Sequence, residues 1–495
     1  MSSLPRYLIP AVLLLALVAC FEQTAVPVKT APPPTSVSTE STGPRILYVA
    51  ANVSGASDSN DGLSPDYSVG RQGPWLTIRH AAQNMLPGDI TYIRAGTYYE
   101  AGIRFVRSGE SGSPITLASY KTESVIIDGS QGNKGSSGIE IANGQSALVI
   151  QGLTIQNMGR SGITTLGNTS KLYEDITIKD CILRRNGLSG IRLTAVDGFL
   201  IDNVEASEND FYGLEIASSE NGSLSPAHGI VRNSSFHHHI GDEGHGLAIN
   251  QGHDITVSNN RSYHNRIHGI DVSDMPKGGE VSHDIFVEGN YSYENGVSGF
   301  SINSDSNHVV YRRNVAYGNG AEWAKHGTGN GFLCYQGCWH VEYYNNTSVG
   351  NTDSGFRFSK PTGSTNQWGD NLLIFKNNIA FNNGLPEWTE RGALAIEGSA
   401  WQVVALYNNW GGAPDMNAPV VGINLVGDQG EIYRTDEINN GALGKDTVSV
   451  DPQFVDLQSR DFHLQPGSPM VDAGTDVGAP FCGAAPDMGA FEVCP

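Results

Sequence analysis

Three side chains in the middle of the sequence are suited to proton transfer. His245, His268 and Asp271 lie in the part of the chain where histidine is concentrated, since nine of the fourteen histidines fall between His228 and His283. Imidazole is the usual acid or base near neutral pH, and a neighbouring carboxylate is expected to raise its pKa. We therefore predict that these three residues are catalytic.

His245 and His268 each precede a glycine that opens a recurring motif. In this motif the glycine is followed by an apolar, a variable and usually a second apolar residue. The glycines of its ten copies are Gly138, Gly162, Gly190, Gly213, Gly246, Gly269, Gly299, Gly331, Gly355 and Gly392. Side chains alternate across a strand, so the apolar residues should point inwards and the variable residue outwards. The outward positions, which include Glu215 and Asp271, should form one exposed strip.

The rest of each repeat predicts further strands and turns. Residues 253–257 are one example of a second run with alternating apolar residues. Asparagines that could hydrogen-bond between repeats recur at Asn186, Asn209, Asn265, Asn295, Asn319, Asn351, Asn383 and at Asn260, Asn290, Asn314, Asn346, Asn378. The pattern predicts an all-β solenoid of about ten coils, whose parallel strands stack about 4.8 Å apart. A helix within residues 75–85 is expected to cover its N-terminal end.

The motifs also carry a family resemblance. Typical copies are Ser189-Gly-Ile-Arg-Leu and His268-Gly-Ile-Asp-Val, and the flanks add Pro87-Gly-Asp-Ile-Thr-Tyr-Ile and Asp451-Pro-Gln-Phe. Residues 125–410 resemble the right-handed parallel β-helix of pectate lyases and related polysaccharide-active proteins. The resemblance implies a single-stranded right-handed parallel β-helix, an extended polysaccharide as the partner, and Ca²⁺ as a candidate cofactor.

Three functions remain open for the strip. We favour β-elimination from an acidic polysaccharide such as pectate or alginate, which needs a base and a group that neutralises the uronate carboxylate. Hydrolysis by paired carboxylates is the alternative reaction, because Glu215 and Asp271 lie two coils, or about 10 Å, apart. A carbohydrate-binding protein or adhesin without catalysis could use the same groove.

Residues near the three catalytic candidates are expected to bind the substrate or a cation. The substrate-binding candidates are Glu215, Asn250, Asn303, Tyr335, Arg357 and Lys360. Asp242, Glu243 and Asp274 offer the carboxylate oxygens that Ca²⁺ prefers. Because outward strand positions should be exposed, we expect replacement of His268 or Asp271 to leave thermal stability nearly unchanged.

The termini predict a lipid-anchored envelope protein. The apolar run from Leu8 to Val18 is typical of a signal peptide, and Leu17-Val18-Ala19-Cys20 resembles the lipobox of bacterial lipoproteins. We therefore expect residues 1–20 to be a lipoprotein signal peptide, with Cys20 lipidated, and residues 21–44 to be a disordered Pro/Thr/Ser tether. Residues 45–124 should form N-terminal strands and a capping helix, 125–411 the β-helix and 412–495 its C-terminal end. The protein should be surface-exposed or secreted at a bacterial cell envelope.

Charge and cysteines narrow the environment and the partners. The formal net charge of −21 argues against a nucleic-acid partner, and no segment after the signal peptide is long and apolar enough to span a membrane. We expect a monomer that touches the membrane only through its lipid. Two pairs of near neighbours, Cys334 with Cys338 and Cys482 with Cys494, could form disulfides in an oxidising compartment, which leaves Cys181 as a buried thiol.

Overall fold

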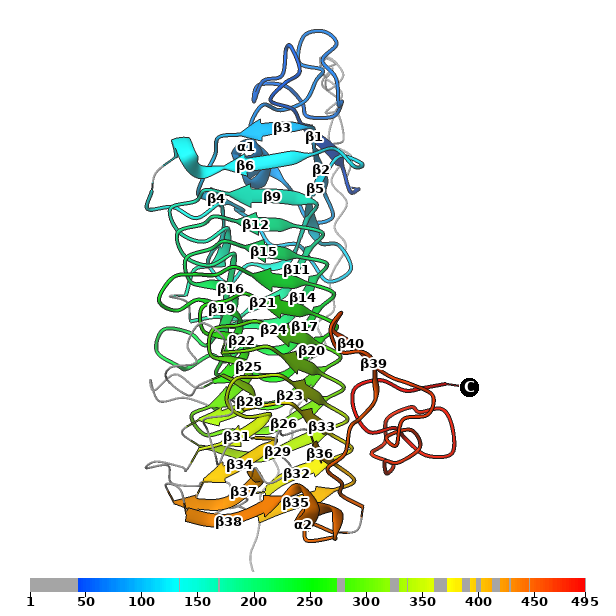
Figure 1. Ribbon diagram of the computed structural model, residues 1–495. Helices are drawn as coiled ribbons and strands as arrows, with labels where there is room; N and C mark the ends of the chain where they lie inside the picture. The colour runs from blue at the N-terminus through cyan, green and yellow to red at the C-terminus, as the bar shows by residue number, and fades with distance from the viewer. Residues whose placement is uncertain are drawn as a thin grey trace, which may run out of the picture. The chain divides into compact units, whose positions relative to one another are not determined.

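A computed structural model describes most of the chain beyond its first 42 residues. The described ranges are 43–132, 134–167, 170–273, 281–320, 329–335, 337–359, 372–384, 392–397, 402–411, 419–426, 429–444 and 446–494. The chain divides into the units Met1–Gly43 and Pro44–Pro495. Three sheets, here called A, B and C, run through the second unit as stacked coils (Figure 1).

Sheet A contains the first strand of each coil and has thirteen parallel strands. They are β1 (Ile46–Val49), β2 (Ile90–Ile93), β5 (Ile115–Ser119), β8 (Ser146–Gln151), β11 (Tyr173–Lys179), β14 (Val196–Asp202), β17 (Ala227–Arg232), β20 (His253–Ser258), β23 (His283–Glu288), β26 (Ser306–Arg312), β29 (Cys338–Tyr344), β32 (Leu372–Lys376) and β35 (Gln402–Leu406).

Sheet B follows after a short turn and has twelve parallel strands, most of them three residues long. They are β3 (Gly96–Tyr98), β6 (Val125–Asp128), β9 (Leu153–Gln156), β12 (Ile182–Arg184), β15 (Glu205–Ser207), β18 (Ser235–His237), β21 (Arg261–Tyr263), β24 (Tyr291–Tyr293), β27 (Val315–Tyr317), β30 (Thr347–Val349), β33 (Ile379–Phe381) and β36 (Asn409–Gly411).

Sheet C holds the glycine motif and has thirteen strands. They are β4 (Ile103–Arg104), β7 (Ile139–Ile141), β10 (Ile163–Thr165), β13 (Ile191–Thr194), β16 (Tyr212–Ala217), β19 (His245–Asn250), β22 (His268–Ser273), β25 (Ser298–Asn303), β28 (Asn330–Tyr335), β31 (Phe356–Phe358), β34 (Leu394–Glu397), β37 (Pro419–Val426) and β38 (Gln429–Arg434). All its pairs are parallel except the last, β37 with β38.

The predicted parallel β-helix is confirmed, but it has more coils than expected. The sheets hold twelve and thirteen strands, whereas the glycine motif predicted about ten coils. The difference lies at the N-terminal end, where β1 to β6 already belong to the three sheets although residues 45–124 lack the motif. Pairing needs only extended backbone with one apolar side, so coils without the glycine escape a search based on it.

The inward positions of the motif form the core. Ile191, Leu214, Ile270 and Phe300 are at most 1% exposed, as the alternation predicted. The glycine allows neighbouring coils to approach closely, since a Cβ on Gly269 would lie 1.8 Å from Oγ of Ser292 on the coil above. Substitution at this glycine would therefore force adjacent coils apart.

Buried asparagines stabilise two of the turns. The amide of Asn265 donates to Oδ1 of Asn295, and that of Asn295 donates to Oδ1 of Asn319, at 2.9 and 3.0 Å. His239 takes the place of an asparagine in this ladder. Its Nδ1 accepts from the backbone of Asn209 at 3.2 Å, and its own N–H donates to Oδ1 of Asn265 at 3.3 Å. One imidazole therefore interrupts the ladder.

Helical structure is short in the described residues. Within the predicted helical segment, α1 spans Ile78–Asn84, is capped by Thr77 and buries Ile78, Ala81 and Ala82. A one-turn 3₁₀ helix spans Gly129–Gln131, and α2 spans Thr435–Asn439. None of the helices in the described part of the chain is long and apolar enough to cross a membrane.

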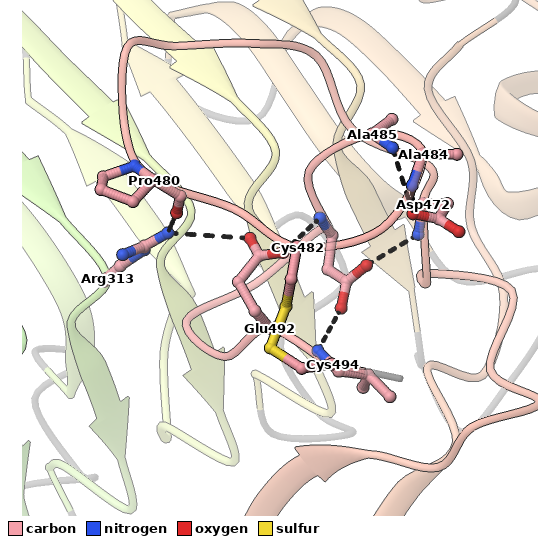
Figure 2. Close-up of a disulfide and its surroundings, with 10 residues drawn as sticks. Arg313, Asp472, Pro480, Cys482, Ala484, Ala485, Glu492 and Cys494 are labelled. Carbon is pink, nitrogen blue, oxygen red and sulfur yellow. Dashed lines mark hydrogen bonds and ion pairs between the residues drawn. A yellow bond between two sulfur atoms is a disulfide. The ribbon is translucent and has the colours of Figure 1, made fainter.

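The C-terminal segment lies along the side of the coils instead of only at their end (Figure 1). After α2 it forms the hairpin β39 (Phe454–Asp456) and β40 (Asp461–Leu464), and its apolar residues pack on outward residues of sheet B, Val315, Val349 and Ile379. A disulfide joins Cys482 to Cys494, and Arg313 of β26's coil bonds the Pro480 carbonyl and pairs with Glu492 at 3.8 Å (Figure 2). The segment predicted to cap the end thus also covers one face.

Candidate carbohydrate site on sheet C

Three aromatic rings stand in a row at the start of neighbouring strands of sheet C. Tyr212, His245 and His268 are the first residues of β16, β19 and β22, each directly before the motif glycine. The ring centroids of Tyr212 and His245 are 5.4 Å apart, and those of His245 and His268 are 5.2 Å apart. The backbone pairing of the coils sets this spacing, because Tyr212 and His245 are register partners.

Asp271 lies beside this row on the outward column of the same sheet. The column is in register from Glu215 through Ala248 to Asp271, as predicted. Oδ2 of Asp271 is 4.0 Å from Nδ1 of His245, and its Oδ1 accepts a hydrogen bond of 2.9 Å from Nδ2 of Asn303. The three predicted catalytic residues are therefore brought together on two adjacent coils.

The expectation of an exposed strip is wrong at this position. His268, His245 and Asp271 are 9%, 8% and 4% exposed. Asn250, another predicted substrate-binding residue, is also buried, and its Oδ1 accepts a hydrogen bond from Ser273. Outward side chains in a stack can be enclosed by segments of other coils, which alternation along one strand does not report.

Burial reverses the expected direction of the histidine pKa. Loss of solvent lowers the pKa of His268 well below its ordinary value, and the neighbouring His245 lowers it further. Burial also raises the pKa of Asp271, against the opposing effects of His245 and of hydrogen bonds from Ser301, Ser273 and Asn303. A neutral imidazole and a carboxyl that retains its proton therefore lie side by side.

Several buried polar atoms of this cluster have no hydrogen-bond partner among the described residues. They are Nδ1 of His245, Nδ1 of His268, Oδ1 of Asn303, Oγ of Ser298 and Nε2 of Gln251. An unsatisfied buried polar group costs roughly 1–3 kcal/mol, so such groups are rare unless a ligand or water completes them. Their concentration on four neighbouring strands, β16's neighbour β19 and β22 among them, indicates a binding site.

Other predicted substrate-binding residues are less available. Oε2 of Glu215 forms an ion pair of 2.8 Å with Nε of Arg192. Arg357, expected to meet a substrate carboxylate, pairs instead with Asp353 at 2.5 Å and Glu397 at 2.8 Å. Tyr335 is half exposed and is the register partner of Asn303, so it borders the cluster. Lys360 lies outside the described residues.

The candidate calcium ligands do not converge in the described part of the chain. Asp242 is largely exposed and pairs with Arg266 at 2.9 Å, while Oε2 of Glu243 lies 3.8 Å from Nε2 of His245. No group of three His, Cys, Asp or Glu side chains that could hold a metal ion occurs among the described residues. These residues do not fit a Ca²⁺ site. Asp274 lies outside the described residues, so calcium binding stays a prediction.

Two features of the site region were not assigned a role from the sequence. Tyr212 was recognised only as part of the repeat, although its position before the glycine matches that of both histidines. Burial raises the pKa of its phenol, and the nearby carboxylates Glu215, Glu243 and Asp271 add to the effect. Arg192 was recognised as outward but not as the partner of Glu215. The cysteine pairs considered above are joined, with Cys334–Cys338 next to Tyr335, and Cys181 is free and buried.

Comparison with known proteins defines the class. One family model, described as a right-handed beta helix region, matches residues 167–348, and a second, described as a Pel9A-like right-handed beta helix region, matches residues 63–209. The crystal structure of pectate lyase Pel9A superposes with a TM-score of 0.55 and 20% identity, over 91% of this chain and 97% of that chain. The chain belongs to the pectate-lyase-like superfamily of right-handed parallel β-helix proteins.

Particular relatives are more distant or partial. The GH136 lacto-N-biosidase from Eubacterium ramulus has a TM-score of 0.53 at 14% identity, over 74% of this chain and 67% of that chain. The uncharacterized protein YwoF of Bacillus subtilis (strain 168) is 32% identical over 170 residues, or 31% of this chain and 30% of YwoF. Pectate lyase PEL9 of Emericella nidulans is 36% identical over 74 residues, 14% of this chain and 18% of the lyase. The chain thus covers less than a third of each curated relative.

Proposed function

We propose that this protein is a lyase that cleaves an acidic polysaccharide such as pectate or alginate by β-elimination. The observation that carries the proposal is the contact between neutral His268, His245 and protonated Asp271, with unpartnered imidazole nitrogens aimed into the cluster. The name of the fold neighbour, a pectate lyase, is consistent with this reaction but shows only the fold.

The proposed chemistry uses each group in the protonation state that burial favours. Nδ1 of His268 removes the proton from C5 of the uronate, the C4–O bond breaks as the C4=C5 double bond forms, and the leaving oxygen takes a proton from the Tyr212 phenol. Asp271 and Nδ2 of Asn303 donate hydrogen bonds to the uronate carboxylate, which makes the C5 proton more acidic. No bound cation is needed for these roles.

The deciding experiment is to incubate the soluble chain without residues 1–44 with polyuronates and neutral glycans, with and without a chelator. We expect an unsaturated product that absorbs in the near ultraviolet, formed equally with the chelator present. His268→Ala should abolish it, whereas His228→Ala, an exposed histidine of sheet A paired with Asp197, should not. New reducing ends without the absorbance would contradict a lyase, and binding without either product would indicate a non-catalytic protein.

One observation favours hydrolysis as the second candidate. Glu215 and Asp271 share the outward column with only Ala248 between them, so they lie about 10 Å apart, close to the roughly 6.5–9.5 Å of inverting glycosidases. Asp271, whose pKa is raised, would be the general acid, and Glu215, which is paired with Arg192, the base. The reducing-end measurement above separates this reaction from elimination.

We also propose that the protein is held at the bacterial cell surface by a lipid on Cys20. The lipobox Leu17-Val18-Ala19-Cys20 supports the proposal. Mass spectrometry of the membrane fraction should find an acylated N-terminal cysteine, and Cys20→Ser should move the protein to the soluble fraction. An unmodified mature N-terminus would refute the anchor.

A further inference from the structure

We propose that a cavity beside α1 is a distal subsite that holds a uronate residue of the same polysaccharide, far from the cluster at Asp271. This inference rests on the proposed function, because it takes the polymer as the ligand. The cavity has a volume of about 670 Å³, and the lining residues used here are Arg79, Tyr99, Glu100, Arg104, Ser136 and Glu140.

The cavity lies at the N-terminal end of the outward column that carries Asp271. Register partners connect the column step by step, in the order Arg104, Glu140, Thr164, Arg192, Glu215, Ala248 and Asp271. Six steps of about 4.8 Å place the cavity about 29 Å from Asp271 along the stack. A polymer that follows the column over Asp271 would therefore reach the cavity.

The lining has the composition of a sugar site. Tyr99 is 53% exposed, so a large part of an amphipathic ring is available beside charged groups. The Arg104 side chain is 57% exposed, and its guanidinium is positioned by Glu140, to which Nε donates at 2.7 Å. Pockets that combine an aromatic surface with a few fixed polar groups are typical of small-molecule recognition.

The polar groups are held in place by the chain itself. Arg79 donates from Nη1 to the Gly102 carbonyl at 3.0 Å, and the Glu100 carboxylate accepts from the backbone N–H groups of Ile78 and Arg79 at 2.8 and 2.9 Å. A ligand would thus meet side chains whose freedom is already restricted, which reduces the entropy lost on binding.

Charge favours an acidic sugar at this position. The protein as a whole has a formal net charge of −21, yet Arg79 and Arg104 both line the cavity, and Arg192 lies on the column between it and Asp271. Arginine's planar guanidinium matches a carboxylate. The C-terminal half of the column offers neutral Ser301 and Leu333 instead, followed by Arg357, which is already paired with two carboxylates.

The test compares short and long oligouronates with Tyr99→Ala and Arg104→Ala. We expect KM for a long oligomer to rise about tenfold, with kcat unchanged, while KM for a trimer that cannot span the column stays the same. Arg232→Ala is the matched control, because Arg232 is also exposed and paired with a carboxylate, Asp202, but on sheet A. Equal losses for short and long substrates, or no loss for either, would overturn the subsite.

Calorimetric binding to the His268→Ala background separates this inference from the proposed reaction. If the wild type shows no turnover but Tyr99→Ala still weakens binding of long oligouronates selectively, the subsite stands and the lyase proposal fails. Turnover with chain-length-independent binding has the opposite meaning. Unchanged thermal midpoints of both variants will show that the fold around α1 is intact, and a failure of the wild type to bind any long oligouronate overturns the subsite.

Discussion

The imidazole rings of His245 and His268 lie 5.2 Å apart, with their planes inclined by 64°, on adjacent strands of sheet C. Two imidazolium ions at this separation would repel each other in a buried setting, so the contact works together with burial to keep His268 neutral. A neutral imidazole can accept a proton at pH values where an exposed histidine is already charged.

The first prediction concerns the pH dependence of catalysis. His268 must be unprotonated to act as the base, and its pKa is well below 6.5, so kcat/KM should stay high as the pH falls below 6.5 and decline only through the lowered pKa. A pH profile of kcat/KM on the best polyuronate will show this. An acid limb centred at or above pH 6.5 would exclude His268 as the base.

The second prediction concerns Asp271→Asn. Because the pKa of Asp271 is raised above 3.8, its carboxyl favours folding when protonated, and this stability is lost as the pH rises through the folded-state pKa. The variant removes a buried ionisable group and should be about 1–3 kcal/mol more stable than the wild type at neutral pH, and similar to it near pH 3. Urea unfolding at both pH values measures the difference.

Activity of the same variant distinguishes the two candidate reactions. An amide can still donate a hydrogen bond to a uronate carboxylate, so a lyase should lose only about tenfold in kcat/KM, together with any alkaline limb due to Asp271. A hydrolase that uses Asp271 as the general acid should lose about 10²–10⁴-fold. Ser273→Ala, which removes a neighbouring hydroxyl, serves as the comparison.

The third prediction is that His239→Asn makes the protein less sensitive to acid. His239 is fully buried, and burial lowers its pKa to about 3. Between the unfolded-state pKa near 6.5 and this value the unfolded chain binds a proton that the folded chain does not, so stability falls by about 1.4 kcal/mol per pH unit as the pH decreases. Asparagine, which occupies the flanking positions of the ladder, has no such proton.

Unfolding free energies at several pH values between 7.5 and 4 will test this. The wild type and His239→Asn should diverge steadily below pH 6.5, whereas a variant of the exposed His463 should follow the wild type. Parallel curves for the wild type and His239→Asn would show that His239 does not govern the acid transition.

The fourth prediction concerns the intact part of the ladder. Nδ2 of Asn295 donates to Asn319 and to the Ser262 carbonyl, and its Oδ1 accepts from the side chain and the backbone of Asn265. Asn295→Ala would leave several buried groups unpaired and should lower the unfolding free energy by about 3 kcal/mol or more. Asn52→Ala, at an exposed asparagine with one hydrogen bond to Ala95, should cost less than about 1 kcal/mol. A comparable loss in both variants would contradict the role of the ladder.

The sequence predicted the architecture because the glycine motif reports backbone register directly. Leu214, Ile270 and Phe300 are inward, and Glu215 and Asp271 share one column, as alternation across strands requires. The first coils were missed because they are held by alternation alone, without the glycine.

The candidate site was only partly predictable. The row of His245 and His268 followed from their positions before the glycine, and Tyr212 could have been included on the same argument. The burial of the row could not be derived, because it depends on segments distant in sequence, and it reverses the pKa direction of His268. The pairing of Arg357 with Asp353 and Glu397 is likewise a contact between side chains that no spacing rule gives.

The unbroken register of sheet C has a consequence for how this protein can diversify. The reactive cluster occupies only the strands from β16 to β25, whereas the length of the column depends on how many coils lie on either side. In a solenoid each coil contacts mainly its neighbours, so duplication or loss of a whole coil between β7 and β13 would alter the reach of the column without moving Tyr212 relative to Asp271. Chain-length preference and reaction chemistry are therefore separately inheritable traits of this molecule.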